Sequence, residues 1–161
     1  MYKEGFTYHI KDIYFINAKK HGLDKELMSN KEGGSFRPTY YAVKDSSTNL
    51  IWVVPLSSKV EKYQRIFNDK AAKHGDCDTI VIGEYDGIKA AFLIQNMFPI
   101  REDYIDHIHT RNGNPVPVKE NTKQEINRKI KKLQQLLKRG IKPVFTEFSR
   151  LEALMLSERK L

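Results

Sequence analysis

Apolar residues along the chain follow two patterns, and the first predicts strands. Short runs rich in aromatic and β-branched residues indicate strands at 6–10, 37–44, 50–56, 79–83 and 89–94. The run at 50–56 is apolar throughout, which indicates a strand buried on both faces. Glycine, proline and polar clusters predict loops or turns at 19–35, 45–49, 85–87 and 111–118.

The second pattern places apolar residues three and four positions apart and predicts helices at 59–75, 122–139 and 147–158. Thr122 and Glu125 have the spacing of a capping box at the start of the longest helix. Gly140 and Pro143 are expected to end it. A helix capped by Asp12 is expected after the first strand, and 101–108 is expected to form a short helix or helical turn.

This order of elements predicts the fold class. Several strands are followed or interrupted by helices without a regular βαβ alternation. We therefore expect one α+β domain over residues 1–161, with a small, strongly curved antiparallel sheet or barrel at its centre. A domain of this size buries about two thirds of the surface that its unfolded chain exposes, so it needs no disulfide or metal to fold.

Composition indicates the cellular compartment. The chain contains one cysteine, its first 20 residues mix charged and apolar side chains, and no apolar run approaches the roughly 20 residues that span a bilayer. We expect a cytoplasmic protein with no membrane partner.

The charge distribution points to nucleic acid as a partner. The net charge is +8, and residues 119–142 hold nine Lys or Arg against two Glu. Because apolar residues occupy one face of this helix, we expect the basic residues to line the other and bind phosphates. The alternative is an ordinary solvated helix face. The expected RNA-binding residues of this helix are Lys119, Lys123, Arg128, Lys131 and Lys132.

A second basic segment, at 59–70, interleaves cations with aromatic residues. This combination suits single-stranded RNA, whose bases stack on aromatic rings. We expect Tyr63 and Arg65 to contact RNA, together with Arg37 and Tyr40 from the strand predicted at 37–44.

Reactive side chains follow the buried strand. Ser57, Ser58 and Lys59 stand at its end, and Lys62 follows one helical turn later. Hydroxyls and cations suit cleavage of RNA by its own 2′-hydroxyl, a reaction that needs proton transfer and positive charge around the phosphate. The alternative is that both serines cap the following helix.

Metal and cofactor motifs are weak. His107 and His109 would share one face of a strand, but two histidines with Asp103 and Asp106 nearby fix no ligand spacing. The chain has no phosphate-binding or dinucleotide-binding glycine motif. We expect no cofactor and no metal.

The segments at 37–43, 54–58 and 91–100, with Tyr8 to Tyr14 near the start, resemble in order the ToxN/AbiQ family, and its CptN-like members most closely. These proteins are the endoribonuclease toxins of type III toxin–antitoxin systems. The resemblance implies an SH3-like barrel of the MazF/Kid type with inserted and C-terminal helices. It also implies metal-independent cleavage that leaves 2′,3′-cyclic phosphate and 5′-hydroxyl ends. A repeated antitoxin RNA that folds into pseudoknots would inhibit the enzyme in a closed RNA–protein complex.

The resemblance assigns catalytic roles residue by residue. Ser57 and Ser58 match the hydroxyl pair that follows Pro-Leu in the family, and Tyr14 matches its N-terminal tyrosine. The family's Ser-Pro-Lys lacks its proline here, so both Lys59 and Lys62 are candidates for the lysine. A non-catalytic RNA-binding module and a metal-dependent nuclease remain the alternative functions.

Overall fold

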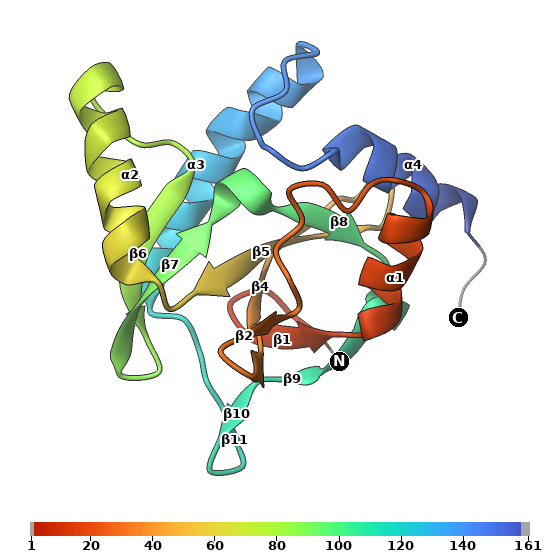
Figure 1. The fold of residues 1–161 in the computed structure, drawn as a ribbon, viewed down its shortest axis with the longest axis horizontal. Coiled ribbons are helices and arrows are strands. Elements are labelled where there is room, and N and C mark those ends of the chain that lie inside the picture. The colour runs from red at the N-terminus through yellow and green to blue at the C-terminus, as the bar shows by residue number, and fades with distance from the viewer. Residues whose placement is uncertain (1, 159–161) are drawn as a thin grey trace.

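Seven strands form one antiparallel sheet in the computed structural model, which describes residues 2–158 (Figure 1). Along the chain they are β1 (Thr7–Ile10), β4 (Thr39–Lys44), β5 (Ile51–Ser57), β6 (Ile80–Tyr85), β7 (Ile88–Leu93), β8 (Phe98–Ile100) and β9 (Ile105–Ile108). Their order is β6-β7-β5-β4-β1-β9, and β8 also pairs with β5. Among the described residues no pairing joins β6 to β9. The predicted α+β class with an antiparallel sheet is confirmed.

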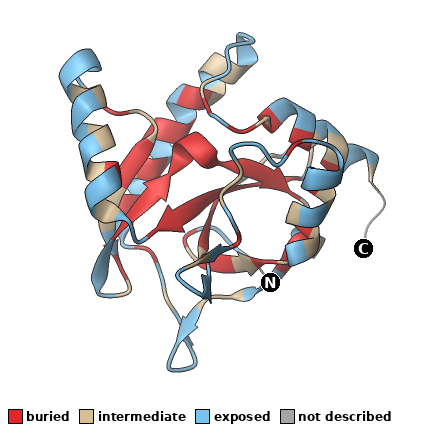
Figure 2. Cartoon of the chain, in the orientation of Figure 1, coloured by how far each residue is buried: buried red, intermediate tan, exposed pale blue. Residues whose placement is uncertain are grey.

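Strand β5 organises this sheet. One edge of β5 pairs with β4, while its other edge pairs first with β8 and then, at Leu56 and Ser57, with β7. All seven residues of β5 are buried, as their continuous apolar run predicted (Figure 2). The strand therefore runs through the centre of the core and delivers Ser57 at a fixed position.

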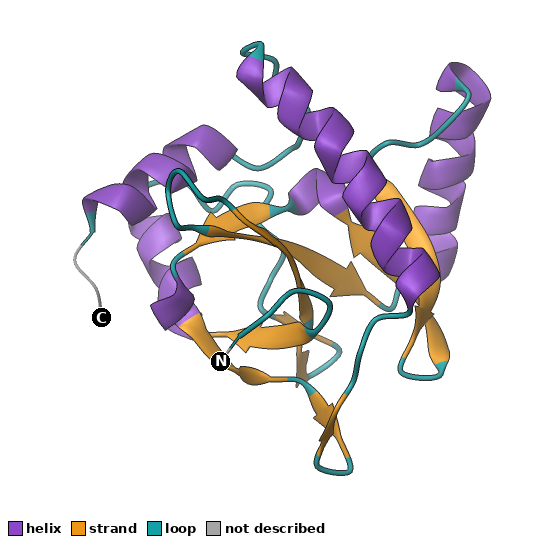
Figure 3. Cartoon of the chain, turned by 180° about the vertical axis from the view of Figure 1, so that it is seen from behind, coloured by secondary structure: helices purple, strands orange, loops and turns teal. Residues whose placement is uncertain are grey.

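Within residues 2–158, four α-helices and two single-turn 3₁₀ helices accompany the sheet. The α-helices are α1 (Asp12–Lys20), α2 (Val60–His74), α3 (Glu120–Lys138) and α4 (Phe148–Ser157), and the 3₁₀ helices are η1 (Ile94–Asn96) and η2 (Glu102–Tyr104). Seen from behind, α3 lies across the sheet (Figure 3). No helix within residues 2–158 has both the length and the apolar character needed to cross a membrane.

Two predicted helix caps are wrong. Helix α3 begins at Glu120, with Lys119 at the cap position, so Thr122 lies inside the first turn and is buried against β6. Helix α1 is preceded by Lys11, and the Asp12 carboxylate accepts a hydrogen bond from Asn30 Nδ2 at 2.9 Å. In both cases the side chain that the local motif assigns to the helix end instead contacts another part of the fold.

Gly83 permits the close approach of α3 to β6. A Cβ at this position would lie 2.8 Å from Thr122 Oγ1 and 3.0 Å from its Cγ2. We expect Gly83→Ala to lower the free energy of unfolding by about 1–3 kcal/mol, because the buried threonine cannot move away freely. Chemical denaturation measures this loss. Adding Thr122→Ala, which removes both contacting atoms, should restore most of it, and a double variant as unstable as Gly83→Ala would contradict the explanation.

Two hairpins occupy stretches that were predicted as loops. They consist of β2 (Lys31–Glu32) with β3 (Ser35–Phe36), and of β10 (Thr110–Arg111) with β11 (Asn114–Pro115). Both are mostly exposed (Figure 2). Asn112 and Gly113 have φ values of 53° and 79°, the conformation that an Asn-Gly hairpin turn requires. The Asn-Gly pair was therefore an available signal for the second hairpin.

The short helix expected at 101–108 is absent, whereas the alternative, a helical turn, forms at η2. Only η2 is helical, and β9 pairs antiparallel with β1 through Ile10, His9 and Tyr8. This pairing carries the chain on to β10 and brings residues about 100 positions apart into contact.

Candidate active site

A cleft of about 370 Å³ opens where β5 ends. The β2–β3 hairpin and the end of β5 form one wall, and the β6–β7 turn with the chain leading into β10 forms the other. The polar residues that line it are Glu32, Ser35, Arg37, Ser57, Ser58, Tyr85, Asp86, Lys89, His109 and Arg111. The cleft thus unites hydroxyls, cations, carboxylates and an imidazole.

Glu32 binds both predicted catalytic serines. Ser57 Oγ donates a hydrogen bond to Glu32 Oε2 at 2.7 Å. The backbone N–H and the hydroxyl of Ser58 donate to Oε1 at 2.7 and 2.6 Å. Both carboxylate oxygens are therefore held against the start of α2.

Arg37 also binds the Glu32 carboxylate. Its Nη1 donates to Glu32 Oε2 and to the backbone oxygen of Leu56, each at 2.8 Å, and its Nε donates to the backbone oxygen of Ser29 at 2.8 Å. The side chain is buried, so its guanidinium is a fixed positive charge behind the serines. Arg37 therefore lies at the cleft that the sequence predicted it would serve.

The donors around Glu32 control its protonation. Burial alone would raise the pKa of this carboxyl, but hydrogen bonds from Ser58, Ser57 and Arg37 outweigh burial and lower the pKa to about 2. Glu32 is consequently ionised at neutral pH. The site favours an anion at this position.

A histidine cluster stands at the opposite wall. His9 Nε2 and His109 Nδ1 share a hydrogen bond of 2.9 Å, and the ring of His107 stacks on His9 with centroids 4.7 Å apart. Burial, followed by the neighbouring histidines, lowers the pKa of His9 to about 4. His9 is therefore neutral at pH 7, and it orients the ring of His109.

Asp86 supports His109 on its other side. His109 Nε2 lies 3.8 Å from Asp86 Oδ2, and Arg111 Nε donates to Asp86 Oδ1 at 2.6 Å. Burial lowers the pKa of His109, and Asp86 opposes this shift only in part. Because Nδ1 is engaged by His9, Nε2 is the ring nitrogen that faces Asp86.

The sequence interpretation missed Glu32, Asp86 and His109 as site residues. The alternation of His107 and His109 along the sequence indicates only a weak metal motif. Within residues 2–158 no three His, Cys, Asp or Glu side chains come together as a possible metal site. The Asp86-Gly87 turn was predicted, and its φ values of 54° and 82° match a tight hairpin turn that aims Asp86 at the cleft.

The serines do not cap α2. The cap position is Lys59, and no side chain caps this helix end. Ser57 is buried and Ser58 exposed, and both hydroxyls donate to Glu32 instead. Ser57 Oγ in addition accepts a hydrogen bond from the backbone N–H of Lys59 at 3.2 Å, so the alternative that the serines serve the helix holds in part for Ser57. Both serines remain candidates for chemistry.

The two candidate lysines lie outside the cleft lining. Lys59 and Lys62 are exposed, and Lys62 Nζ sits 5.2 Å from the ring centroid of Tyr63. The lysine and exposed arginine that line the cleft are Lys89 and Arg111. The lysine that lines the cleft therefore differs from the two that the spacing favoured.

Three tyrosines that the sequence assigned to the site, Tyr14 to catalysis and Tyr40 and Tyr63 to RNA binding, are buried. Tyr14 and Tyr40 pack in two separate parts of the core, and the hydroxyl of Tyr14 donates to the backbone oxygen of Pro99 at 2.9 Å. Tyr63 is buried beneath α2 beside Ile80 and Leu93. Tyr14 and Tyr40 cannot contact RNA in this structure, and Tyr63 offers it little surface; Arg65, by contrast, is exposed.

We expect Tyr14→Phe to leave RNA cleavage unchanged and to reduce the free energy of unfolding by about 1 kcal/mol, because it strands a buried carbonyl oxygen. Thermal denaturation and a cleavage assay on the same preparation measure the two effects. A large loss of cleavage without a loss of stability would restore the catalytic role that the family resemblance implies.

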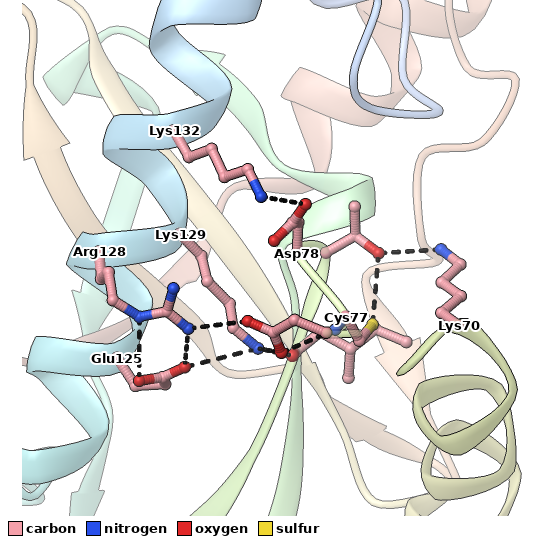
Figure 4. A network of polar contacts seen from close by, with 10 residues as sticks. Lys70, Cys77, Asp78, Glu125, Arg128, Lys129 and Lys132 are labelled. Atoms are coloured by element: carbon pink, nitrogen blue, oxygen red, sulfur yellow. Dashed lines mark hydrogen bonds and ion pairs between the residues drawn. The ribbon is translucent and has the colours of Figure 1, made fainter. Parts of the chain in front are cut away.

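The basic face of α3 is largely neutralised by acids, some from the helix itself and some from other elements. Figure 4 shows Arg128 and Lys129 directed toward Glu125, and Lys132 directed toward Asp78. Ion pairs to a carboxylate hold four of the five predicted RNA-binding residues of this helix: Lys119, Lys123, Arg128 and Lys132. Lys131 is exposed.

Lys129 contradicts the expectation that all basic residues of α3 line its exposed face. It is 1% exposed, and its Nζ donates to the backbone oxygen of Ile80 at 2.9 Å. The same atom lies 4.9 Å from the ring centroid of Phe67. This lysine connects α3 to β6 and α2, so it acts in packing.

No protein-family model matches the sequence, and no curated protein matches it. The functional interpretation therefore depends on the chemistry of the cleft, together with the sequence resemblance described above.

Proposed function

We propose that this protein is a metal-independent endoribonuclease toxin that cleaves RNA by attack of the 2′-hydroxyl on the adjacent phosphate. The observation that carries this proposal is that one cleft unites Ser57, Ser58 and Arg37 with His109. In this reaction the 2′-oxygen forms a bond to phosphorus and the bond to the 5′-oxygen breaks. The products are a 2′,3′-cyclic phosphate and a 5′-hydroxyl.

The serine wall binds the phosphate. Two hydroxyls, one backbone N–H and a guanidinium already converge on an anion, namely the Glu32 carboxylate. The same donors stabilise the additional negative charge that phosphate oxygens acquire in the transition state. Lys89 and Arg111 add positive charge at the opposite wall.

His109 transfers the proton. Its lowered pKa keeps the ring neutral at pH 7, the form that accepts the proton of the 2′-hydroxyl. Asp86, near Nε2, stabilises the imidazolium that this step produces. The protonated ring is then in position to return a proton to the leaving 5′-oxygen.

The cleft rim offers apolar surface for bases. Phe36 and Ile88 are both exposed and lie on opposite walls of the cleft. A solvent-exposed aromatic ring beside a phosphate site suits stacking of an unpaired base. We therefore assign single-stranded RNA as the substrate.

The remaining expectations belong to the same proposal. We infer an SH3-like barrel of the MazF/Kid type, a cytoplasmic location and inhibition by a repeated pseudoknot RNA in a closed complex. The resemblance at 37–43, 54–58 and 91–100 supports them. Short tandem repeats followed by a terminator-like hairpin are expected in the DNA just upstream of the gene, and their absence would weaken this part of the proposal.

A cleavage assay tests the activity. Purified protein is incubated with a single-stranded transcript in EDTA, and the product ends are analysed. Fragments with cyclic phosphate ends support the enzyme. Intact but electrophoretically shifted RNA would indicate a non-catalytic binding module, and cleavage that EDTA abolishes would indicate a metal-dependent nuclease.

A further inference from the structure

We propose that Ser57, Ser58 and Arg37 form a phosphodiester-binding cradle that Glu32 fills in the free protein, so that RNA enters the site only by displacing the tip of the β2–β3 hairpin. This inference rests on the proposed function, because it takes the phosphate of the RNA substrate as the ligand. It adds a self-inhibited resting state to that function.

The donor set fits a phosphate. Each oxygen of Glu32 receives two hydrogen bonds, Oε2 from Ser57 and Arg37 and Oε1 from the N–H and hydroxyl of Ser58. The two free oxygens of a phosphodiester accept hydrogen bonds in the same way and carry the same single charge. The carboxylate is thus an internal stand-in for the phosphate.

The position in the fold also favours an anion. The Ser58 N–H that binds Glu32 directly precedes the 15-residue helix α2, which begins at Val60. The N-terminal end of a helix carries partial positive charge and unpaired N–H groups. The helix reinforces a cradle that the side chains of Ser57, Ser58 and Arg37 already define.

The cradle does not depend on Glu32 for its shape. Arg37 remains fixed by the backbone oxygen of Leu56, which belongs to β5, and Ser57 is part of the same strand. When the carboxylate leaves, these donors stay where an incoming phosphate needs them. The cradle is consequently preorganised.

The hairpin that carries Glu32 is small. Its two strands have two residues each, and Gly33 and Gly34 join them with positive φ values of 59° and 84°. Its base is anchored at Asn30, whose Nδ2 donates to the backbone oxygen of Ile10 at 2.9 Å and whose backbone oxygen accepts from Arg37 N at 2.7 Å. The exposed tip can therefore swing without disturbing the sheet.

Displacement of the hairpin lowers the apparent affinity for RNA. When an internal group occupies a site, the apparent affinity of a ligand equals its intrinsic affinity multiplied by the fraction of molecules whose site is free. Removing the Glu32 carboxylate should remove this competition. The loss of the carboxylate should change the affinity for RNA rather than the rate of the chemical step.

The test compares Glu32→Ala with Glu61→Ala by fluorescence anisotropy, using an RNA oligonucleotide whose nucleotides are all 2′-O-methylated and therefore cannot be cleaved. Glu61 is exposed in the first turn of α2, so its replacement makes the same change in net charge. We expect Glu32→Ala to bind about tenfold more tightly than wild type, and Glu61→Ala to change affinity by less than about twofold. Equal affinities for the two variants would overturn the proposal.

Kinetics on cleavable RNA separate this role from catalysis. Glu32→Ala should lower KM and keep kcat within about threefold, whereas a fall in kcat of about 100-fold would make Glu32 a general base and overturn the proposal. If neither protein cleaves RNA but Glu32→Ala still binds more tightly, the enzyme assignment fails and the cradle stands. Glu32→Gln keeps the shape of the side chain and one acceptor oxygen, so it should gain less RNA affinity than Glu32→Ala. If Glu32→Ala does not fold, the same criteria apply to Glu32→Gln.

Discussion

Replacing His109 with alanine should lower kcat for RNA cleavage by about 10²–10⁴-fold, the range that a positioned acid–base group contributes. The ring lies in the cleft with the serines, and its Nε2 faces Asp86 at 3.8 Å. RNA binding should change little, since the donors that hold the phosphate come from the other wall. Single-turnover cleavage and anisotropy on 2′-O-methylated RNA measure the two quantities separately.

The dependence of kcat/KM on pH tests the same role of His109. Burial lowers the pKa of His109, and a base must be unprotonated, so wild-type kcat/KM should be flat near pH 7 and fall in acid as the ring takes up a proton. This acid limb should vanish in His109→Ala. His74→Ala is the matched control, because His74 is exposed at the end of α2 and lies outside the cleft lining. A full rate in His109→Ala would eliminate the residue as the base.

The missed histidine cluster shows where sequence interpretation stopped. His9 and His109 meet because β9 pairs with β1, and 105–108 had been interpreted as helical. Because residues 105–108 were not predicted as a strand, the contact between His9 and His109, 100 positions apart, was not predicted either. By contrast, the continuous apolar run of β5 was predicted well, because burial on both faces leaves a strong compositional signal.

Glu32 was missed for a different reason. It lies in a glycine-rich stretch that looks like a loop, and nothing local connects it to serines 25 and 26 positions later. The identity of a contact partner depends on how the chain closes, which a pattern of apolar residues does not encode.

Motif resemblance and amphipathicity also have limits, and Tyr14 and Lys129 illustrate them. Tyr14 fits the family's tyrosine by position, yet its hydroxyl is consumed by a core carbonyl oxygen. Lys129 belongs to a basic run, yet it falls at the edge of the buried face of α3 and points inward. A count of the charges within the helix omits Asp76 and Asp78, two acidic residues of another segment that pair with Arg128 and Lys132.

Replacing Ser57 with alanine should abolish toxicity when the protein is expressed in growing cells. Ser57 Oγ is buried at the end of β5 and donates at 2.7 Å to the anion that occupies the cradle. Removing such a preorganised donor typically costs about 10²–10³ in kcat. Ser58→Ala should have a smaller effect, because the backbone N–H of Ser58 still donates at this position.

The fold of Ser57→Ala should be nearly intact, because one hydrogen bond contributes about 1 kcal/mol to the free energy of unfolding. Ser149→Ala, in an exposed position of α4, is the matched control and should remain fully toxic. Growth inhibition at equal expression, checked by immunoblot, is the readout. If Ser57→Ala is as toxic as wild type, Ser57 does not stabilise the transition state, and the cleft would have to act through Arg37 and His109 alone.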